Sequence, residues 1–349
     1  MEFGLQFFPN VTPEEIGPAQ YFDNCIALSR EAETLGFTHT RMVEHYFHRY
    51  GGYSPNPLMF LSSLAQHTKT MRLVTGAILP VFSNPLKMAA EIAMADALSH
   101  GRLDVGFARA FLPHEFRRFG ISQDESVGRF REGLEQIELL LTQKNVTHEG
   151  QFHRIVDTTS YPPVAQRPKF YIAATQTPES FEFAGRKGYC LMAMPMGQGI
   201  RKLFDIYRAA WREAGHPGKG EIMVAFHMFC DEDSARAREI ARGPFDAYFR
   251  TIVEVTSDFA TTPDSSNYRG YKESMSKMDT ITLEKNIAAA TAWIGTPGEV
   301  KLLIERMIEE TGGFEHASMQ VQFSNMELSV AQKSMRMFAR DVLPAFAER

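Results

Sequence analysis

Short apolar runs that alternate with longer amphipathic stretches are the feature that most constrains how this chain can fold. Eight runs are expected to be β-strands: Phe3–Phe8, Thr38–Val43, Arg72–Ile78, Leu103–Phe107, Phe170–Ala174, Tyr189–Met192, Met223–Phe229 and Ser318–Val321. An amphipathic segment follows nearly every run, and strands joined by crossover helices pair in parallel. No GxGxxG motif follows the first run, which disfavours a doubly wound dinucleotide-binding sheet. The sequence therefore predicts an α/β fold of the (β/α)₈ TIM-barrel type.

The amphipathic stretches have the start signals of helices. A Thr and a Glu at Thr296–Glu299 are spaced as a capping box, and a Thr-Pro pair opens the segment that begins at Thr177. The expected helices are Pro18–Leu35, Pro57–Gln66, Asn84–Leu98, Ser122–Leu141, Pro178–Lys187, Gly199–Glu213, Ser234–Phe249, Leu283–Trp293, Pro297–Glu310 and Glu327–Phe346.

Two stretches are longer than ordinary loops, and we expect them to be insertions in a single domain over residues 1–349. Residues 145–169 contain a turn between β-prone segments and predict a hairpin before a Pro-rich connection. Residues 251–280 are expected to be the second insertion, and Thr256–Thr280 within them is polar. A long insertion in a barrel either acts as a lid or pocket wall or is a solvated surface loop, and the residues are consistent with both interpretations.

Composition excludes several classes of function. Hydrophobic residues make up 44% of the 349 residues, as in globular proteins with a sizeable core. The net charge of −5 and the pI near 6.1 argue against a nucleic-acid or anionic-membrane partner. No apolar run reaches the roughly 18 residues of a membrane span, and the N-terminus lacks the basic segment of a signal peptide. Three dispersed cysteines indicate a reducing compartment, so we expect a cytoplasmic protein.

Candidate functional residues follow the expected strands, because a barrel of this type carries its active site at the carboxyl ends of the strands. They are Glu44-His45 after the second strand, Gly76-Ala77 at the end of the third, Ala108-Arg109 after the fourth, Thr175–Ser180 after the fifth and Met192, Met194 and Met196 around the end of the sixth.

Two of these positions suggest a phosphate. Arg109 follows an apolar strand and needs a partner if it is buried. The helix after Thr177 offers unpaired N–H groups and the positive end of its dipole, with hydroxyl groups on Thr175 and Ser180. Residues Thr177 and Ser180 are equally consistent with simple helix capping.

The remaining positions are open to two interpretations each. His45 suits a general acid or base or a structural histidine, and its surroundings lack the spacing of a metal site. Gly76-Ala77 would let a flat ring approach the backbone, or would satisfy packing alone. Met192 and its neighbours would form an adaptable wall for an apolar substrate.

The order and spacing of short motifs add a family resemblance. The sequence resembles the bacterial luciferase-like flavin monooxygenases, and the luciferase α subunit in particular. The matching segments are Gly36-Phe37, Val43–Phe47, Asn56-Pro57, Thr75–Ile78, Asn84-Pro85, Leu98–Arg102, Gly106–Arg109, Phe116–Gly120, Gly295–Glu299 and Asp341–Pro344.

The resemblance implies a two-component monooxygenase. Such an enzyme receives reduced FMN from a separate NAD(P)H:flavin reductase and uses O₂, through a C4a-(hydro)peroxyflavin, to oxygenate an organic substrate. For this chain we expect a small to medium apolar aldehyde, ketone or similar molecule. The resemblance also implies a homodimer, or a luciferase-like heterodimer, through the helices that match 57–66 and 84–98.

The resemblance also carries roles over to individual residues. His45 matches the catalytic histidine beside the isoalloxazine and Glu44 matches the neighbouring acid. The expected cofactor-binding residues are Gly76 and Ala77 (a cis peptide against the flavin ring), Ala108, Arg109 and Ser180 (the last two at the phosphate), Thr175 or Gln176, and Met192. Ala108 stands where the luciferase α subunit has a reactive cysteine, which weakens a light-emitting function more than an oxygenase function.

Two alternatives remain at this point. The first is a deazaflavin-dependent oxidoreductase on the same barrel, which turnover with each reduced cofactor would distinguish. The second is a non-catalytic flavin-binding subunit like the luciferase β subunit, which the retention of His45 and Arg109 disfavours.

Overall fold

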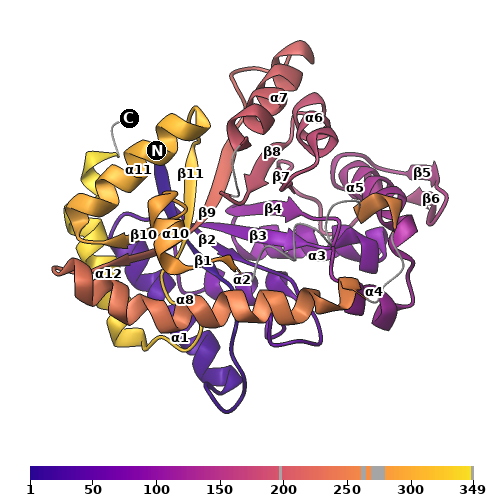
Figure 1. Ribbon diagram of the computed structural model, residues 1–349. Helices are drawn as coiled ribbons and strands as arrows, with labels where there is room; N and C mark the ends of the chain where they lie inside the picture. Colours follow the sequence, from indigo (N-terminus) through magenta and orange to yellow (C-terminus); the bar gives the residue numbers. More distant parts are fainter. Residues whose placement is uncertain (196–198, 261–264, 269–279, 347–349) are drawn as a thin grey trace.

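Eight parallel strands form a closed barrel, because β8 pairs with β9 as well as with β7 (Figure 1). The computed structural model describes residues 1–195, 199–260, 265–268 and 280–346. The barrel strands are β1 (Glu2–Phe7), β2 (His39–Met42), β3 (Arg72–Ile78), β4 (Leu103–Phe107), β7 (Lys169–Ala173), β8 (Cys190–Ala193), β9 (Ile222–Cys230) and β11 (His316–Gln320). The predicted TIM barrel and all eight predicted strands are confirmed.

Three further strands lie outside the barrel wall. The hairpin predicted within residues 145–169 is present as the antiparallel pair β5 (Val146–Glu149) and β6 (Arg154–Thr158). Strand β10 (Ala292–Gly295) pairs with the second half of β9 and was expected to be the end of a helix. That expectation was wrong because Trp293 is fully buried and stacks on Phe226 of β9, with ring centroids 3.8 Å apart, so tertiary pairing overrides the local pattern.

The helices surround the barrel. They are α1 (Pro18–Thr34), α2 (Pro57–Ala65), α3 (Pro85–Leu98), α4 (Pro113–Phe119), α5 (Ser126–Thr142), α6 (Pro178–Lys187), α7 (Ile200–Glu213), α8 (Ser234–Thr256), α10 (Leu283–Ala288), α11 (Pro297–Thr311) and α12 (Leu328–Asp341). Helix α4 was not expected, and α5 begins four residues later than predicted. Helix α12 ends at Asp341, before Leu343-Pro344, because the residue that precedes a proline disfavours the helical conformation.

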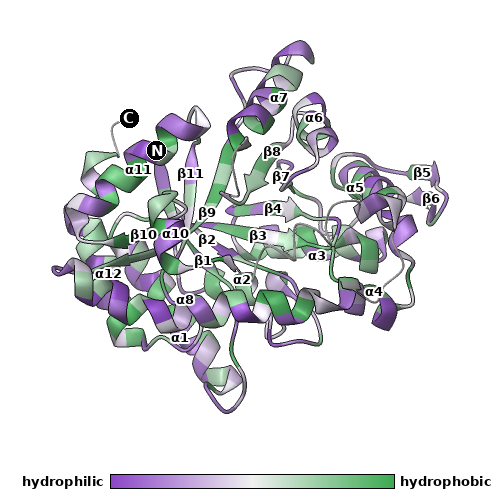
Figure 2. Cartoon of the chain, in the orientation of Figure 1, coloured by the Kyte–Doolittle hydropathy of each residue, from purple (hydrophilic) through white to green (hydrophobic). Residues whose placement is uncertain are grey.

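Amphipathic helices cover the outside of the barrel. Figure 2 shows hydrophobic and hydrophilic residues alternating along α8, α11 and α12. The capping box predicted at Thr296 is present, with the Thr296 hydroxyl accepting from the Glu299 N–H and the Glu299 carboxylate accepting from the Thr296 N–H. The two ends of the described chain meet where the Met1 amino group donates to the Phe346 carbonyl at 3.1 Å. None of the helices in the described ranges is long and apolar enough to cross a membrane.

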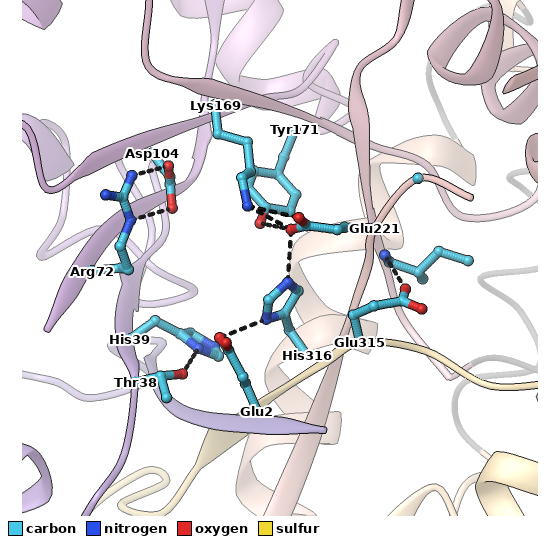
Figure 3. A network of polar contacts seen from close by, with 12 residues as sticks. Glu2, Thr38, His39, Arg72, Asp104, Lys169, Tyr171, Glu221, Glu315 and His316 are labelled. Atoms are coloured by element: carbon cyan, nitrogen blue, oxygen red, sulfur yellow. Dashed lines mark hydrogen bonds and ion pairs between the residues drawn. The ribbon is translucent and has the colours of Figure 1, made fainter. Parts of the chain in front are cut away.

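A network of charged side chains closes the amino-terminal end of the barrel (Figure 3). His316 lies at its centre, with Nε2 2.9 Å from a Glu221 carboxylate oxygen and Nδ1 3.2 Å from a Glu2 carboxylate oxygen. Lys169 also donates to Glu221 at 2.6 Å. These residues begin β11, β1 and β7 or directly precede β9, so the network ties together strands that are distant in sequence. In barrels of this type the amino-terminal face serves stability rather than catalysis.

Candidate active site at the barrel mouth

The predicted site residues lie at the opposite end, which we call the barrel mouth: the carboxyl ends of the barrel strands and the loops that follow them. Strands β2, β3, β4 and β7 are consecutive neighbours in the sheet. The residues expected after them, from Glu44 to Ser180, therefore lie along one side of the mouth. The structure thus places four of the five strand ends that the sequence singled out next to one another, and the fifth, that of β8, follows β7.

His45 is held in place by a buried carboxylate. Its Nδ1 lies 3.1 Å from Oε1 of Glu115, whose side chain is fully buried on α4. The backbone N–H of Tyr46 donates to the same oxygen at 2.9 Å. Gly51 has a φ of +77°, and a Cβ there would lie 2.6 Å from the His45 ring, so only glycine allows this approach. With Nδ1 held by Glu115, Nε2 is the nitrogen of His45 left to act on a ligand.

An aromatic wall surrounds the His45 ring. The rings of Phe8, Tyr50 and Phe111 have centroids 5.5, 5.1 and 6.1 Å from it. The His45 side chain is only 12% exposed. Such surroundings exclude water from the imidazole, which suits a group that transfers protons in a dry site.

Glu44 has different partners from those of His45. Its carboxylate accepts a hydrogen bond from the Tyr46 hydroxyl at 2.6 Å. Burial raises the pKa of Glu44 to about 8, although the hydrogen bond from Tyr46 opposes this rise. The carboxyl group therefore holds a proton near neutral pH, so it suits proton storage rather than binding of a cation.

The Gly76-Ala77 peptide bond is cis, as the family resemblance implies. A side chain at Gly76 would place its Cβ 2.0 Å from Nε of Arg41 on β2. Arg41 therefore accounts for the glycine at position 76. Sequence reasoning missed Arg41, although the argument applied to Arg109, a cation among apolar residues in a strand, applies to it equally.

Arg109 contacts the second insertion. Its Nη2 donates to the Asn267 carbonyl at 2.9 Å, and its guanidinium carbon lies 4.6 Å from the centre of the Tyr268 ring. The Tyr268 hydroxyl donates to the Ala110 carbonyl at 3.0 Å. Residues 261–264 and 269–279 of the 251–280 insertion lie outside the described residues. Among the described residues no carboxylate forms an ion pair with Arg109, whose guanidinium contacts the Asn267 carbonyl and the Tyr268 ring instead.

Helix α6 begins beside this strand end. Thr177 is its N-cap residue, but the Thr177 hydroxyl makes no capping hydrogen bond, so the expected Thr side-chain cap is wrong. The backbone N–H of Ser180 instead donates to the Thr177 carbonyl at 2.9 Å. Thr175 and Ser180 are half-buried and Gln176 is exposed. The backbone, not the side chain, orders this helix start, so the Thr177 hydroxyl is not committed to capping.

Two expected cofactor-binding residues differ in their access to the mouth. Met192 is 2% exposed and packs inside the barrel, where its Cε and Sδ lie 2.7 and 2.8 Å from the position of a Cβ on Gly106. Ala108 is half-buried at the end of β4. Met194 is described, whereas Met196 lies outside the described residues. Ala108 is thus the more accessible of the two.

His45 and Arg109 line neither of two cavities found at the surface. One has a volume of about 540 Å³ and lies between α7 and α11. The other has a volume of about 270 Å³ and lies between α4 and α8, beside Phe47 and His48. In the described part of the chain no group of three or more His, Cys, Asp or Glu side chains could hold a metal ion.

Comparisons with known proteins show the family of the chain. Residues 1–314 match the model of the luciferase-like monooxygenase family. The whole chain is 27% identical to the oxygenase component of a flavin-dependent trigonelline monooxygenase of Acinetobacter baylyi, of which the match covers 96%. The whole chain is also 24% identical to the alkanal monooxygenase alpha chain of Photorhabdus luminescens, of which the match covers 98%.

Solved structures share the fold of the chain. Monooxygenase RslO1 from Streptomyces bottropensis has a TM-score of 0.89 and 38% identity, with 99% of this chain and all of that chain covered. The oxygenating constituent of 3,6-diketocamphane monooxygenase from Pseudomonas putida, solved with FMN, shares the fold (TM-score 0.83, 21% identity, 99% and 98% covered). An F420-dependent secondary alcohol dehydrogenase shares it too (TM-score 0.74, 17% identity, 99% and 98% covered). The chain belongs to the luciferase-like monooxygenase family and is a flavin-dependent monooxygenase.

Proposed function

We propose that this chain is the oxygenase component of a two-component system, which takes reduced FMN from a separate NAD(P)H:flavin reductase and oxygenates a small to medium organic substrate with O₂. The observation that carries the proposal is the barrel mouth itself: His45 fixed by a fully buried Glu115, small residues at the Gly76-Ala77 strand end, and the cation of Arg109 on neighbouring strands. The named relatives that are monooxygenases support it.

The residues of the mouth fit FMN. Arg109 lacks a carboxylate partner in the described ranges, and the N-terminus of α6, with Thr175, Gln176 and Ser180 beside it, offers N–H and hydroxyl donors to a phosphate. The small residues Ala77 and Ala108 would leave room for a flat ring. When bound and reduced, FMN supplies the activation of O₂, and the protein supplies position and a dry environment.

The chain's own residues would then act around the cofactor. Nε2 of His45 would hold or move a proton at the reacting centre, since Nδ1 is held by Glu115. Glu44, protonated near neutral pH, would keep the adjacent wall free of negative charge. The aromatic side chains around His45 would exclude water.

Equilibrium binding of reduced and oxidised FMN, followed by oxygen consumption and product analysis, tests the proposal. Arg109→Ala should weaken FMN binding by about 2–3 kcal/mol, the size of a lost charge-assisted contact. Arg340→Ala, which removes an exposed arginine of α12, should leave FMN binding unchanged. Equal FMN affinity in both variants would refute the phosphate role of Arg109.

His45→Ala should leave FMN affinity unchanged but divert oxygen consumption from product to H₂O₂. His67→Ala removes an exposed histidine and serves as the control. An unchanged product yield per flavin oxidised would remove His45 from the chemistry. The same assays with reduced deazaflavin test the second candidate, which the likeness to an F420-dependent dehydrogenase favours; turnover with deazaflavin alone would select it.

We also propose that the protein dimerises through α2 and α3. Large apolar side chains are exposed on these two helices: Met59 (72%), Leu86 (36%), Met94 (58%) and Leu98 (39%). Exposed apolar side chains gathered in this way on a water-soluble surface indicate an interaction site.

A further inference from the structure

Arg41 is a buried cation whose hydrogen bonds are incomplete. It is 7% exposed, inside the barrel at the end of β2. Its Nε and Nη2 donate to the Gly76 carbonyl at 3.3 and 3.1 Å. Its Nη1 is buried and has no hydrogen-bond partner, and within the described ranges no carboxylate forms an ion pair with it. A buried guanidinium in this state is unusual, because buried charges are normally paired.

Two other arginines of the barrel, Arg72 and Arg102, have several acceptors each. Arg72 on β3 forms an ion pair with Asp104 and also donates to two backbone carbonyls. Arg102 donates to three backbone carbonyls and the Thr68 hydroxyl. Arg167 and Arg238 also have a buried guanidinium nitrogen without a hydrogen-bond partner, but each has a carboxylate within ion-pair distance, Glu138 and Glu299. In the described ranges Arg41 has no such carboxylate, so its unpaired donor points to a ligand rather than to a packing role.

The free donor of Arg41 is buried beside the end of β3. Gly76, which is in direct contact with the Arg41 side chain, begins the cis peptide expected to contact the flavin. Gln6 of β1 is the register partner of Arg41, so the two side chains point to the same side of the sheet. Oε1 of Gln6 is also buried without a partner, as is Nε2 of His227 on β9. Three interior strands therefore leave polar atoms without partners at one level of the barrel.

Aromatic contacts connect this polar cluster to His45. Tyr248 of α8 lies 4.9 Å from the His227 ring and 5.3 Å from the Phe8 ring, and Phe8 lies 5.5 Å from the His45 ring (centroid distances). Burial raises the pKa of Tyr248 to about 12. The positive charge of Arg41 opposes this rise, so the two side chains lie near each other. A continuous series of ring contacts thus links the surroundings of Arg41 to those of His45.

We infer that Arg41 anchors an anionic oxygen of the organic substrate, so that this oxygenase acts on a molecule with a carboxylate, or an equally acidic oxygen, on an otherwise apolar body. The inference rests on the proposed function and deepens it by naming the substrate class. The guanidinium donates through Nη1 to the anion while Nε and Nη2 stay on Gly76. Burial lowers the pKa of Arg41 to about 10, so the cation persists at neutral pH. An apolar aldehyde without an acidic group would leave the Nη1 donor unpaired.

The test compares carboxylates with their uncharged amides. Purified protein, with and without bound oxidised FMN, is titrated calorimetrically with benzoate, phenylacetate and octanoate, each beside the corresponding amide. We expect at least one carboxylate to bind more tightly than its amide. Arg41→Met should weaken the binding of that carboxylate by about 10- to 100-fold, the range for a lost charge-assisted hydrogen bond. The affinity for the amide should not change. Arg49→Met removes a half-exposed arginine paired with Glu254 and should not change either affinity.

Unfolding in urea checks that the Arg41 variant remains folded. Because the unpaired guanidinium is costly to bury, Arg41→Met is expected to be at least as stable as the wild type. Bound carboxylate should raise the melting temperature of the wild type but not that of Arg41→Met. Arg41→Lys keeps the charge and is expected to recover part of the carboxylate affinity.

Two results would overturn the inference. Either no carboxylate binds more tightly than its amide, or Arg41→Met leaves the preference for carboxylate intact. The reduced flavin is a second possible anion at this place. Arg41→Met could weaken the binding of reduced FMN, but not of oxidised FMN, and leave carboxylate binding unchanged. In that case the anion is the flavin and the assignment to the substrate is wrong. Failure to bind FMN at all would instead refute the proposed function, and the FMN titration separates that result from the others.

Discussion

The network at the amino-terminal end of the barrel makes a quantitative prediction about stability. His316 bridges Glu2 and Glu221, and these hydrogen bonds outweigh burial and raise the pKa of His316 from 6.5 to about 9. At about 1.36 kcal/mol per pKa unit, this difference corresponds to about 3 kcal/mol. Because the Glu2 and Glu221 side chains are 55% and 35% exposed, solvent screening reduces the contribution to about 2 kcal/mol.

The sign of the pH dependence follows from the raised pKa. The folded protein keeps the His316 proton that the unfolded chain loses above pH 6.5, so the stabilisation is complete below pH 6.5 and disappears as the pH rises through about 9. Glu2 and Glu221 act in the opposite range, since His316 lowers the pKa of each from 4.5 to about 2. Their contribution is present above pH 4.5 and disappears as the pH falls toward 2.

Urea unfolding of the wild type and His316→Gln at a series of pH values measures this contribution. The variant should be less stable by about 2 kcal/mol near pH 6, and the two free energies of unfolding should converge toward pH 10. His67→Gln changes an exposed histidine and should follow the wild type throughout. A difference between wild type and His316→Gln that stays constant from pH 6 to 10 would refute the reasoning.

Three further predictions concern the site, the assembly and a helix start. Glu115→Gln keeps an acceptor but removes the charge opposite His45, so product yield per flavin oxidised should fall while FMN affinity stays unchanged; an unaltered yield would contradict a role for Glu115 in positioning. Met94→Glu should shift the protein toward monomers in sedimentation velocity, whereas Leu302→Glu on α11 should not; a wild type that is already monomeric would exclude the proposed interface. Thr296→Ala should lower the free energy of unfolding by about 1 kcal/mol, and no change in urea unfolding would argue against the capping box.

Much of the barrel could be predicted from the sequence because the local pattern of apolar residues indicates its strands. Apolar runs such as Arg72–Ile78 and Leu103–Phe107 are short, and amphipathic segments follow them. That alternation has few solutions other than parallel strands with crossover helices. The places of His45, Gly76-Ala77 and Arg109 at the mouth follow from the same rule, because each comes at or directly after the end of a strand.

Tertiary structure decided which side chains meet. Strand β10 forms because Trp293 stacks on Phe226 from a distant strand, and no local pattern contains that partner. Likewise Glu115 reaches His45 across 70 residues, and the Arg41 side chain fills the space left by Gly76 across 35. Sequence shows which residue types stand near strand ends, but register, strand tilt and helix packing determine which of them come into contact. The missing acceptor of Arg41 is visible only once its neighbours are in place.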